Sequence, residues 1–301
     1  MRVARSFEEI ALPQPALLTI GTFDGVHRGH RFLLEQAVQR SREHGYVLLI
    51  VTFDPCPAVV LRPTIGRYQL TTAGQKLRLL EALGADMVVM LPFNQELAAV
   101  RPEEFMAHLE ARVQLREMWL GEDFHFGRDR SGGLQMLVAR GQEVGFSLHV
   151  VARRMEESAS ISSTRVRQAL GAGDVEHALP LLGRPFAVEL EDGGRSASST
   201  VESAVYDIAP HLALPTDGVY AAIRSDETTR AQPVAVSVQR DLPAEQLTVW
   251  SVTEGSATSD LEFINRLGSL DEYRDPRASV DRASTLLEHW ERPLYPASGN
   301  Y

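Results

Sequence analysis

The first 185 residues alternate between short apolar runs and longer amphipathic stretches. The apolar runs, in which hydrophobic residues follow one another without alternation, lie at 16–20, 46–53, 86–91 and 146–151, with a weaker run at 117–121. The stretches between them carry apolar residues at helical spacing, at 31–44, 74–84, 102–114 and 133–144. Continuously apolar strands joined by helices predict a parallel sheet covered on both faces. We expect an α/β fold with a Rossmann-like, doubly wound sheet in this half.

The pattern changes after residue 185. Short runs rich in valine and other β-branched residues are separated by Gly, Pro, Ser and Asp, and lie at 186–190, 201–208, 218–224, 233–239 and 247–252. Such runs are typical of a small antiparallel barrel or sandwich. The apolar residues of 258–291 predict one or two C-terminal helices that close it. We expect two domains, 1–185 and 186–301, which agrees with the usual size of hydrophobic cores.

Charge and composition narrow the classes of function. The 301 residues carry a formal net charge of −10, which argues against binding to a nucleic-acid backbone and favours a small phosphorylated substrate held by a local basic patch. The single cysteine, Cys56, excludes an internal disulfide. No run approaches the ~20 apolar residues of a membrane span. We expect a cytoplasmic protein without a membrane partner, and the sequence gives no indication of its oligomeric state.

Residues 21–30, Gly-Thr-Phe-Asp-Gly-Val-His-Arg-Gly-His, connect the first apolar run to the first amphipathic stretch. A strand that turns through glycine into a helix directs backbone N–H groups and the positive end of the helix dipole to one point, where a phosphate can bind. His27 and His30 lie at this point and could be zinc ligands, a phosphate clamp or surface residues. One cysteine gives little support to a zinc site. Phosphate transfer fits better, because it needs donors that strengthen as charge builds on the phosphates.

Three more polar segments extend this candidate site. Residues 54–57 and 121–128 also follow predicted strands, and ligands of parallel sheets bind beyond the carboxyl ends of the strands. Farther along, Ser163 and Thr164 precede Arg167 by about one helical turn. These three side chains can form a second phosphate cradle, although both hydroxyls could equally be N-caps of a helix at 164–170.

With these segments in place, the chain resembles the bifunctional prokaryotic riboflavin kinase/FAD synthetase family. The resemblance rests on four motifs in the same order, at 18–30, 52–55, 121–127 and 161–167. It implies that the first half is a nucleotidyltransferase, an FMN adenylyltransferase that uses ATP and Mg²⁺ and releases FAD and pyrophosphate. The metal ligands are not assigned.

The resemblance also implies roles for individual residues. The residues expected to contact the triphosphate during catalysis are His27, His30, Ser163, Thr164 and Arg167. Those expected along the nucleotide are Gly21, Thr22, Phe23, Asp24, Gly29 and Asp123. Those expected to face the flavin are Phe53, Pro55, Phe124 and Phe126. An isoalloxazine ring is a broad apolar plane that suits phenylalanine, but each of these rings could equally belong to the core.

Two positions in the first half depart from the family pattern. Ser160 stands where an arginine is common, and Cys56 stands where a histidine is usual. A missing charge-assisted contact costs ~1.5–3 kcal/mol if nothing replaces it. The candidates to replace it are Arg153, Arg154 and Arg165.

The second half departs further. The threonine that holds magnesium in riboflavin kinases is replaced by Val201, and the glutamate that acts as base is replaced by Thr248, although the family's approach to its second barrel strand persists at 214–221. Threonine cannot accept a proton near neutral pH. We expect an FMN adenylyltransferase whose riboflavin-kinase-like barrel has lost its activity. Three alternatives stay open: an enzyme with both activities, a catalytically silent flavin- or nucleotide-binding regulator, and a transferase for another small phosphorylated acceptor.

Overall fold

The computed structural model describes residues 1–156, 158–197, 202–225, 231–239, 246–251, 259–288 and 290–291. It divides the chain into two compact units. The first contains Met1–Gly66 and Ala73–Ile161, and the second contains Arg67–Thr72 and the described residues from Ser162 to 291. The second unit therefore begins before the boundary at 185 that the sequence suggests, and it includes a six-residue segment whose neighbours in sequence belong to the first unit.

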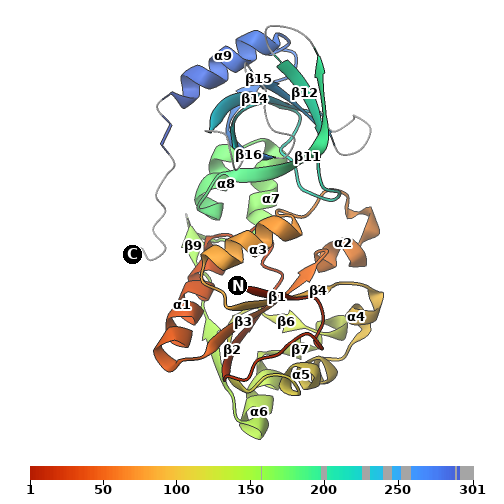
Figure 1. The fold of residues 1–301 in the computed structure, drawn as a ribbon, viewed down its shortest axis with the longest axis vertical. Helices are drawn as coiled ribbons and strands as arrows, with labels where there is room; N and C mark the ends of the chain where they lie inside the picture. Colours follow the sequence, from red (N-terminus) through yellow and green to blue (C-terminus); the bar gives the residue numbers. More distant parts are fainter. Residues whose placement is uncertain are drawn as a thin grey trace. The chain divides into compact units, whose positions relative to one another are not determined.

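A six-stranded parallel sheet forms the centre of the first unit, as the sequence predicted (Figure 1). Its strands, in spatial order, are β1 (Arg2–Ala4), β4 (Met87–Pro92), β3 (Val47–Asp54), β2 (Ala16–Ile20), β5 (Leu115–Gly121) and β8 (Ser147–Val151). Strand β2 lies in the middle and all five of its residues are buried. The carboxyl end of β2 is therefore surrounded by the ends of β3 and β5.

Helices cover both faces of this sheet (Figure 1). On one face, α1 (Arg28–His44) and α3 (Ala73–Ala82) bury Leu34 and Leu80 against Ile50. On the other face, α5 (Pro102–Glu110) and α6 (Leu134–Val144) bury Phe105 and Leu137 against the sheet. The connections contain α2 (Pro57–Leu61), α4 (Gln95–Ala99), the 3-10 turns η1 (Pro63–Ile65) and η2 (Arg128–Arg130), and the strand pairs β6 (His125–Phe126) with β7 (Gly132–Gly133) and β9 (Met155–Glu156) with β10 (Ala159–Ser160).

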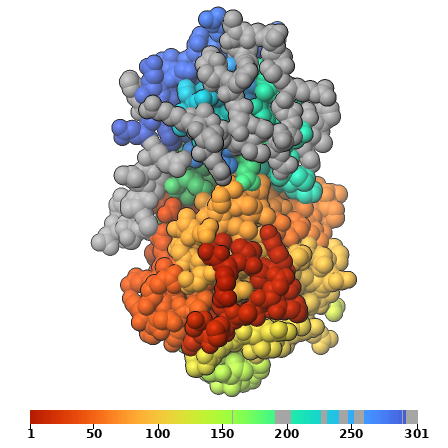
Figure 2. Space-filling view, in the orientation of Figure 1, coloured from red at the N-terminus to blue at the C-terminus, as the bar shows by residue number. Residues whose placement is uncertain are grey.

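Strand β1 is an edge strand that the hydrophobic pattern did not reveal. It has three residues, and only Ala4 is buried. Figure 2 shows the N-terminal residues, in dark red, spread over one face of the first unit. Such a short edge strand leaves no run of apolar residues in the sequence, which explains why it was missed.

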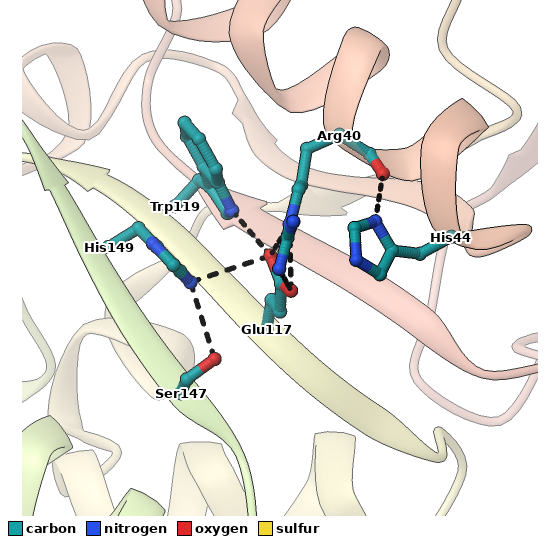
Figure 3. A network of polar contacts seen from close by, with 6 residues as sticks. All are labelled: Arg40, His44, Glu117, Trp119, Ser147 and His149. Carbon is teal, nitrogen blue, oxygen red and sulfur yellow. Dashed lines mark hydrogen bonds and ion pairs between the residues drawn. The ribbon is translucent and has the colours of Figure 1, made fainter.

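A buried carboxylate connects α1 to the sheet (Figure 3). Arg40 of α1 donates to Glu117 of β5, with its Nε 3.0 Å and its Nη2 2.7 Å from Oε1. Trp119 Nε1 donates to Oε2 of the same carboxylate at 2.9 Å, and His149 stacks on the indole with ring centroids 4.8 Å apart. Burial alone would raise the pKa of Glu117, but the hydrogen bonds from Arg40 and Trp119 outweigh it and lower the pKa. Glu117 is therefore ionised at neutral pH and fixes the position of α1.

The second unit contains a closed antiparallel barrel, as the sequence predicted. Its strands are, in order around the barrel, β11 (Phe186–Ala197), β12 (Glu202–Asp207), β15 (Gln246–Ser251), β14 (Gln232–Val238), β13 (Gly218–Ser225) and β16 (Ser259–Gly268). Helix α9 (Pro276–Leu287) packs on it, with Val280 and Ala283 buried against Val219 and Ala235. Two further helices, α7 (Ser163–Ala172) and α8 (Val175–Leu182), precede the barrel.

One sequence prediction in this unit is wrong in part. Residues 259–268, expected within a helical tail, form strand β16, and only α9 is helical. The register against β13 shifts between Phe263 and Asn265, so Ile264 is an extra residue in the ladder. This bulge places buried side chains at 261, 263 and 264, a spacing that imitates the face of a helix.

Candidate active site

The candidate site in the first unit starts at the turn between β2 and α1. The backbone N–H of Gly21 donates to Val51 O at 3.0 Å, and Thr52 Oγ1 donates to Thr22 O at 3.0 Å. These bonds fix the turn to the neighbouring strand β3. Gly21 also packs closely against Phe23, because an added Cβ would lie 3.0 Å from its ring and would require the ring to shift.

Three residues of this turn have positive φ. The values are 45° for Phe23, 80° for Gly25 and 38° for Val26. A positive φ is a genuine outlier for a β-branched residue such as valine, and such conformations cost about 1–3 kcal/mol each and gather at functional sites. The conformation of 23–26 is therefore a specific shape that the surrounding packing enforces.

His27 and His30 form a stacked pair at the start of α1. Their ring centroids lie 3.6 Å apart with an interplanar angle of 15°, and Phe23 packs edge-on against His30 at 5.3 Å. His27 is the N-cap of α1, and its Nδ1 accepts the N–H of His30 at 3.2 Å. Because Nδ1 accepts, the ring proton of neutral His27 is on Nε2. Gly29 packs closely against this pair, since an added Cβ would lie 3.1 Å from the ring of His27 and would require that ring to shift.

His30 is uncharged at neutral pH. Burial lowers the pKa of His30 well below its ordinary value, and the neighbouring His27 and Lys76 lower it further. Its Nδ1 is shielded from solvent and has no hydrogen-bond partner among the described residues. A proton on that nitrogen would leave a dry, unpaired N–H, which is costly. Neutral His30 therefore carries its ring proton on Nε2.

Lys76 is a residue of this region that the sequence analysis missed. Its side chain on α3 is 1% exposed, and Nζ donates to Phe53 O at 2.9 Å. Burial lowers the pKa of Lys76, whereas Asp24, Cys56 and Asp54 raise it. A signal was present in the sequence, because Lys76 is the only lysine among the 30 lysine and arginine residues.

The second predicted segment follows β3. Phe53 is half-buried and packs edge-on against Phe93 at 5.6 Å. The Asp54–Pro55 peptide bond is cis. Cys56 is buried at the start of α2. Phe53 and Pro55 therefore border the carboxyl end of β3, where the sequence analysis expected the flavin.

The third segment follows β5. Phe124 is half-buried and stacks on Phe126 with ring centroids 5.3 Å apart, and Phe126 is buried against Phe105. Phe126 thus belongs to the core, whereas Phe124 lies at its margin. Asp123 is exposed and forms an ion pair with Arg153.

Ser160, which stands where an arginine is common in the family, lies in the strand pair β9–β10. Ser160 pairs with Met155 in this ladder. Two of the candidate replacements lie in the same unit: Arg153 pairs with Glu122 at 3.5 Å, and the guanidinium of Arg154 lies 5.5 Å from the ring centroid of Phe32. A third arginine, Arg28 at the start of α1, pairs with Glu156 at 2.7 Å. Each of these three arginines therefore has a contact within the first unit.

Ser163, Thr164 and Arg167 lie on α7 in the second unit. The N-cap of α7 is Ser162, whose side chain accepts the N–H of Arg165 at 3.3 Å. The capping role considered for Ser163 and Thr164 is therefore wrong, and both belong to the first turn of the helix. Arg167 Nε donates to Tyr68 O at 2.7 Å, and its guanidinium lies 3.6 Å from the ring centroid of Tyr68.

Val201 and Thr248 are the two positions at which the sequence lacks expected riboflavin-kinase residues, and the structure describes only one of them. Val201 lies outside the described residues. Thr248 lies on β15, paired with Val205 on one side and Ser237 on the other.

No group of three or more His, Cys, Asp or Glu side chains within the described part of the chain is arranged to hold a metal ion. None of the described helices is both long and apolar enough to cross a membrane.

Comparison with protein families gives a match to FAD synthetase over residues 9–165. The bifunctional riboflavin kinase/FMN adenylyltransferase of Escherichia coli K12 is 35% identical over 62% of this chain. The match spans 61% of the length of that relative. The enzyme of the same description from Pseudomonas fluorescens is 37% identical, over 56% of this chain and 55% of its own length. A putative one from Geobacillus thermodenitrificans is 35% identical over 62% of this chain and 99% of its own length.

A crystal structure described as a macrolide-efflux protein from Streptococcus pneumoniae has a similar fold. Its TM-score is 0.80, it covers 96% of this chain and 99% of its own, and the two sequences are 21% identical. At this level of identity the similarity concerns the fold alone.

Proposed function

The chain belongs to the FAD synthetase family, and we propose that it transfers the AMP group of ATP to FMN, giving FAD and pyrophosphate. One observation carries the proposal. The stacked pair His27 and His30 lies where the turn 21–26, with its positive φ angles, leads into helix α1. This turn lies within the residues that match the family.

The reaction requires little covalent chemistry from the protein. A phosphate oxygen of FMN attacks the α-phosphorus of ATP, the new O–P bond forms, and the bond from the α-phosphorus to the oxygen of pyrophosphate breaks. The attacking oxygen is already anionic, so no general base is needed. The protein has to orient the two phosphates and donate hydrogen bonds where negative charge increases. His27 and His30 are the proposed donors, each through Nε2.

Residues of the turn and of the strand ends are proposed to bind the rest of the substrates. Backbone groups of 21–24 and Gly29, together with Asp123, would lie along the nucleotide. Phe53, Pro55 and Phe124 would contact the flavin, whereas Phe126 would support Phe124 from the core.

Residues of α7 in the second unit are proposed to bind phosphate. Ser163 and Thr164 lie in the first turn of this helix, where backbone N–H groups and the dipole favour a phosphate. Arg167 donates from Nε to Tyr68 O. The contact with Tyr68 would orient the guanidinium in the absence of substrate.

Magnesium is proposed to enter with ATP. Mg²⁺ would neutralise charge on the phosphates, and the protein's own residues would hold the complex in place.

Riboflavin phosphorylation is proposed to be absent. Thr248 occupies the place of the catalytic glutamate and has no carboxylate to offer, and Val201 has no oxygen for a metal. The full bifunctional activity named for the relatives is the second candidate, favoured by the closed barrel that the second unit retains. Incubation with ATP, Mg²⁺ and either FMN or riboflavin, followed by chromatography of the flavins, distinguishes the two. A cytoplasmic location stays a prediction.

A further inference from the structure

Arg28 is a cation at an end of α1 that favours negative charge. It is the first residue of the helix and follows the N-cap His27 directly. The positive end of a helix dipole attracts acidic side chains and disfavours basic ones, yet the first turn of α1 contains no acidic residue. The helix alone therefore does not explain an arginine at this position, whereas an anion bound here would.

Glu156 on β9 supplies such an anion in the structure. Its Oε2 accepts a hydrogen bond from Nη1 of Arg28 at 2.7 Å, which is the length of a charge-assisted bond. The side chains of Arg28 and Glu156 are 14% and 28% exposed, so the pair is partly withdrawn from water. Guanidinium groups bind carboxylate and phosphate oxygens with the same planar fork of donors. The carboxylate of Glu156 therefore occupies a position that suits a phosphate oxygen.

The segment that carries Glu156 lies against the start of α1 at two further points. The guanidinium of Arg154 lies 5.5 Å from the ring centroid of Phe32, one helical turn after Arg28. A Cβ on Gly29 would lie 3.1 Å from the ring of His27 and 3.3 Å from Ile161 O. Gly29 thus has the first ring of the histidine pair and the backbone that follows β10 as close neighbours. The ion pair of Arg28 is therefore part of the candidate site.

We propose that Arg28 is a further triphosphate-binding residue of this site and that Glu156 competes with ATP for its guanidinium. In the free protein the carboxylate holds Arg28, and a phosphate oxygen of ATP takes the place of that carboxylate on binding. The free energy of the ion pair is then subtracted from that of the new phosphate contact, so Glu156 lowers the affinity for ATP. The inference rests on the proposed function in one respect, the use of ATP as the nucleotide substrate.

The test measures the Kd of ATP with Mg²⁺ for the full chain by isothermal titration calorimetry, without FMN. Arg28→Met is expected to raise the Kd about tenfold, because one charge-assisted contact with the triphosphate is lost. Glu156→Gln is expected to lower the Kd about two- to fivefold, the range that follows from the strength of a partly exposed ion pair. An ion pair that only holds the two segments together would weaken ATP binding in both variants, and that result overturns the proposal.

A double variant separates competition for Arg28 from a general effect of charge. Removal of a carboxylate favours any nearby anion, whether or not Arg28 takes part. In Arg28→Met/Glu156→Gln the gain from Glu156→Gln is expected to disappear, so that the two effects are not additive. An equal gain from Glu156→Gln with and without Arg28 overturns the proposal.

The pair of Arg31 and Glu35 on the same helix is the matched control. Its Nη2–Oε1 distance is 3.5 Å, and the two side chains are 28% and 22% exposed. Arg31→Met and Glu35→Gln are expected to leave the Kd of ATP unchanged. A decrease in Glu35→Gln as large as that in Glu156→Gln contradicts the proposal.

Glu156→Gln carries the test by itself if Arg28→Met does not fold, because glutamine has nearly the shape of glutamate. An unchanged or raised Kd in this variant overturns the proposal. The outcome is separate from that of the proposed function. The expected shifts in Kd without FAD formation from FMN would support the inference and contradict the function, and FAD formation with unshifted Kd values would do the reverse. A chain that binds no ATP contradicts both.

Discussion

The imidazole of His30 stacks on that of His27, with ring centroids 3.6 Å apart. The backbone N–H of His30 also donates to Nδ1 of His27. The cap of α1 and the stacked pair are therefore one arrangement. It fixes the tautomer of His27 and leaves Nδ1 of His30 shielded from solvent. The role proposed for each histidine follows from this arrangement.

Replacing His30 by alanine is expected to lower kcat for FAD formation by roughly 10²–10³-fold, the usual cost of removing one donor to the transition state. The KM for ATP should change little, because the donor acts mainly as charge builds up. The measurement is steady-state kinetics with FMN and ATP. His44→Ala, at the other end of α1 and exposed, is the matched control and should keep full activity. An equal loss of binding and turnover in His30→Ala would show that the ring only holds the substrate.

The lowered pKa of His30 also predicts how stability depends on pH. The unfolded chain takes up a proton on this residue near its ordinary pKa of 6.5, whereas the folded protein takes it up only well below that value. The stability from this group is therefore complete above 6.5 and is lost as the pH falls through 6.5 toward the folded pKa, by up to about 1.4 kcal/mol per pH unit.

Urea unfolding at pH 7.5 and 5.5 measures this effect. The unaltered protein is expected to lose more free energy of unfolding between the two pH values than His30→Gln, which cannot titrate. Equal losses in both proteins would mean that His30 is not held neutral in the folded state.

Restoring an arginine at Ser160 is expected to lower the KM for ATP about tenfold, equivalent to about 1.4 kcal/mol. The expectation follows from the departure of this position from the family pattern. Ala159→Arg is the control, because neighbouring residues of β10 point to opposite faces. If KM stays the same in Ser160→Arg, another arginine already supplies the contact, and Arg28, Arg153 and Arg154 are the candidates within the first unit.

The protein is expected not to convert riboflavin to FMN. Phosphoryl transfer needs a metal on the phosphates and a group that orients the attacking hydroxyl, and neither Val201 nor Thr248 can supply these. FMN production from riboflavin and ATP should stay at background in the full chain. Sustained turnover above about 0.1 s⁻¹, near the slow end of typical enzymes, would show that the kinase site uses other residues.

Much of the first unit could be predicted from the sequence. Continuously apolar runs revealed β2, β3 and β4, and the polar segments that follow β2 and β3 indicated the sheet edge that carries the candidate site. The proximity of His27 and His30 was also predictable, because residues three apart share a helix face. Their stacking and the charge of His30 were not, since these depend on packing against Phe23 and on burial in the folded structure.

The errors in the second unit have local causes. The bulge at Ile264 gave strand β16 the apolar spacing of a helix. The cap of α7 was assigned one or two residues too late, because three hydroxyl-bearing residues stand in a row and the sequence does not show which of them leaves the helical conformation first. Segment 67–72, with Tyr68 against Arg167, joins the second unit through contacts between residues far apart in sequence, which periodicity cannot reveal.

The proposed adenylyl transfer is measured by incubating the purified chain with ATP, Mg²⁺ and FMN and following FAD by chromatography, with pyrophosphate measured in the same samples. FAD and pyrophosphate are expected to form in equal amounts, and both are expected to fall together in His30→Ala. A protein that is folded and binds FMN, yet forms no FAD at high substrate concentrations, would contradict the proposed transfer and would favour a silent flavin-binding protein that keeps the fold.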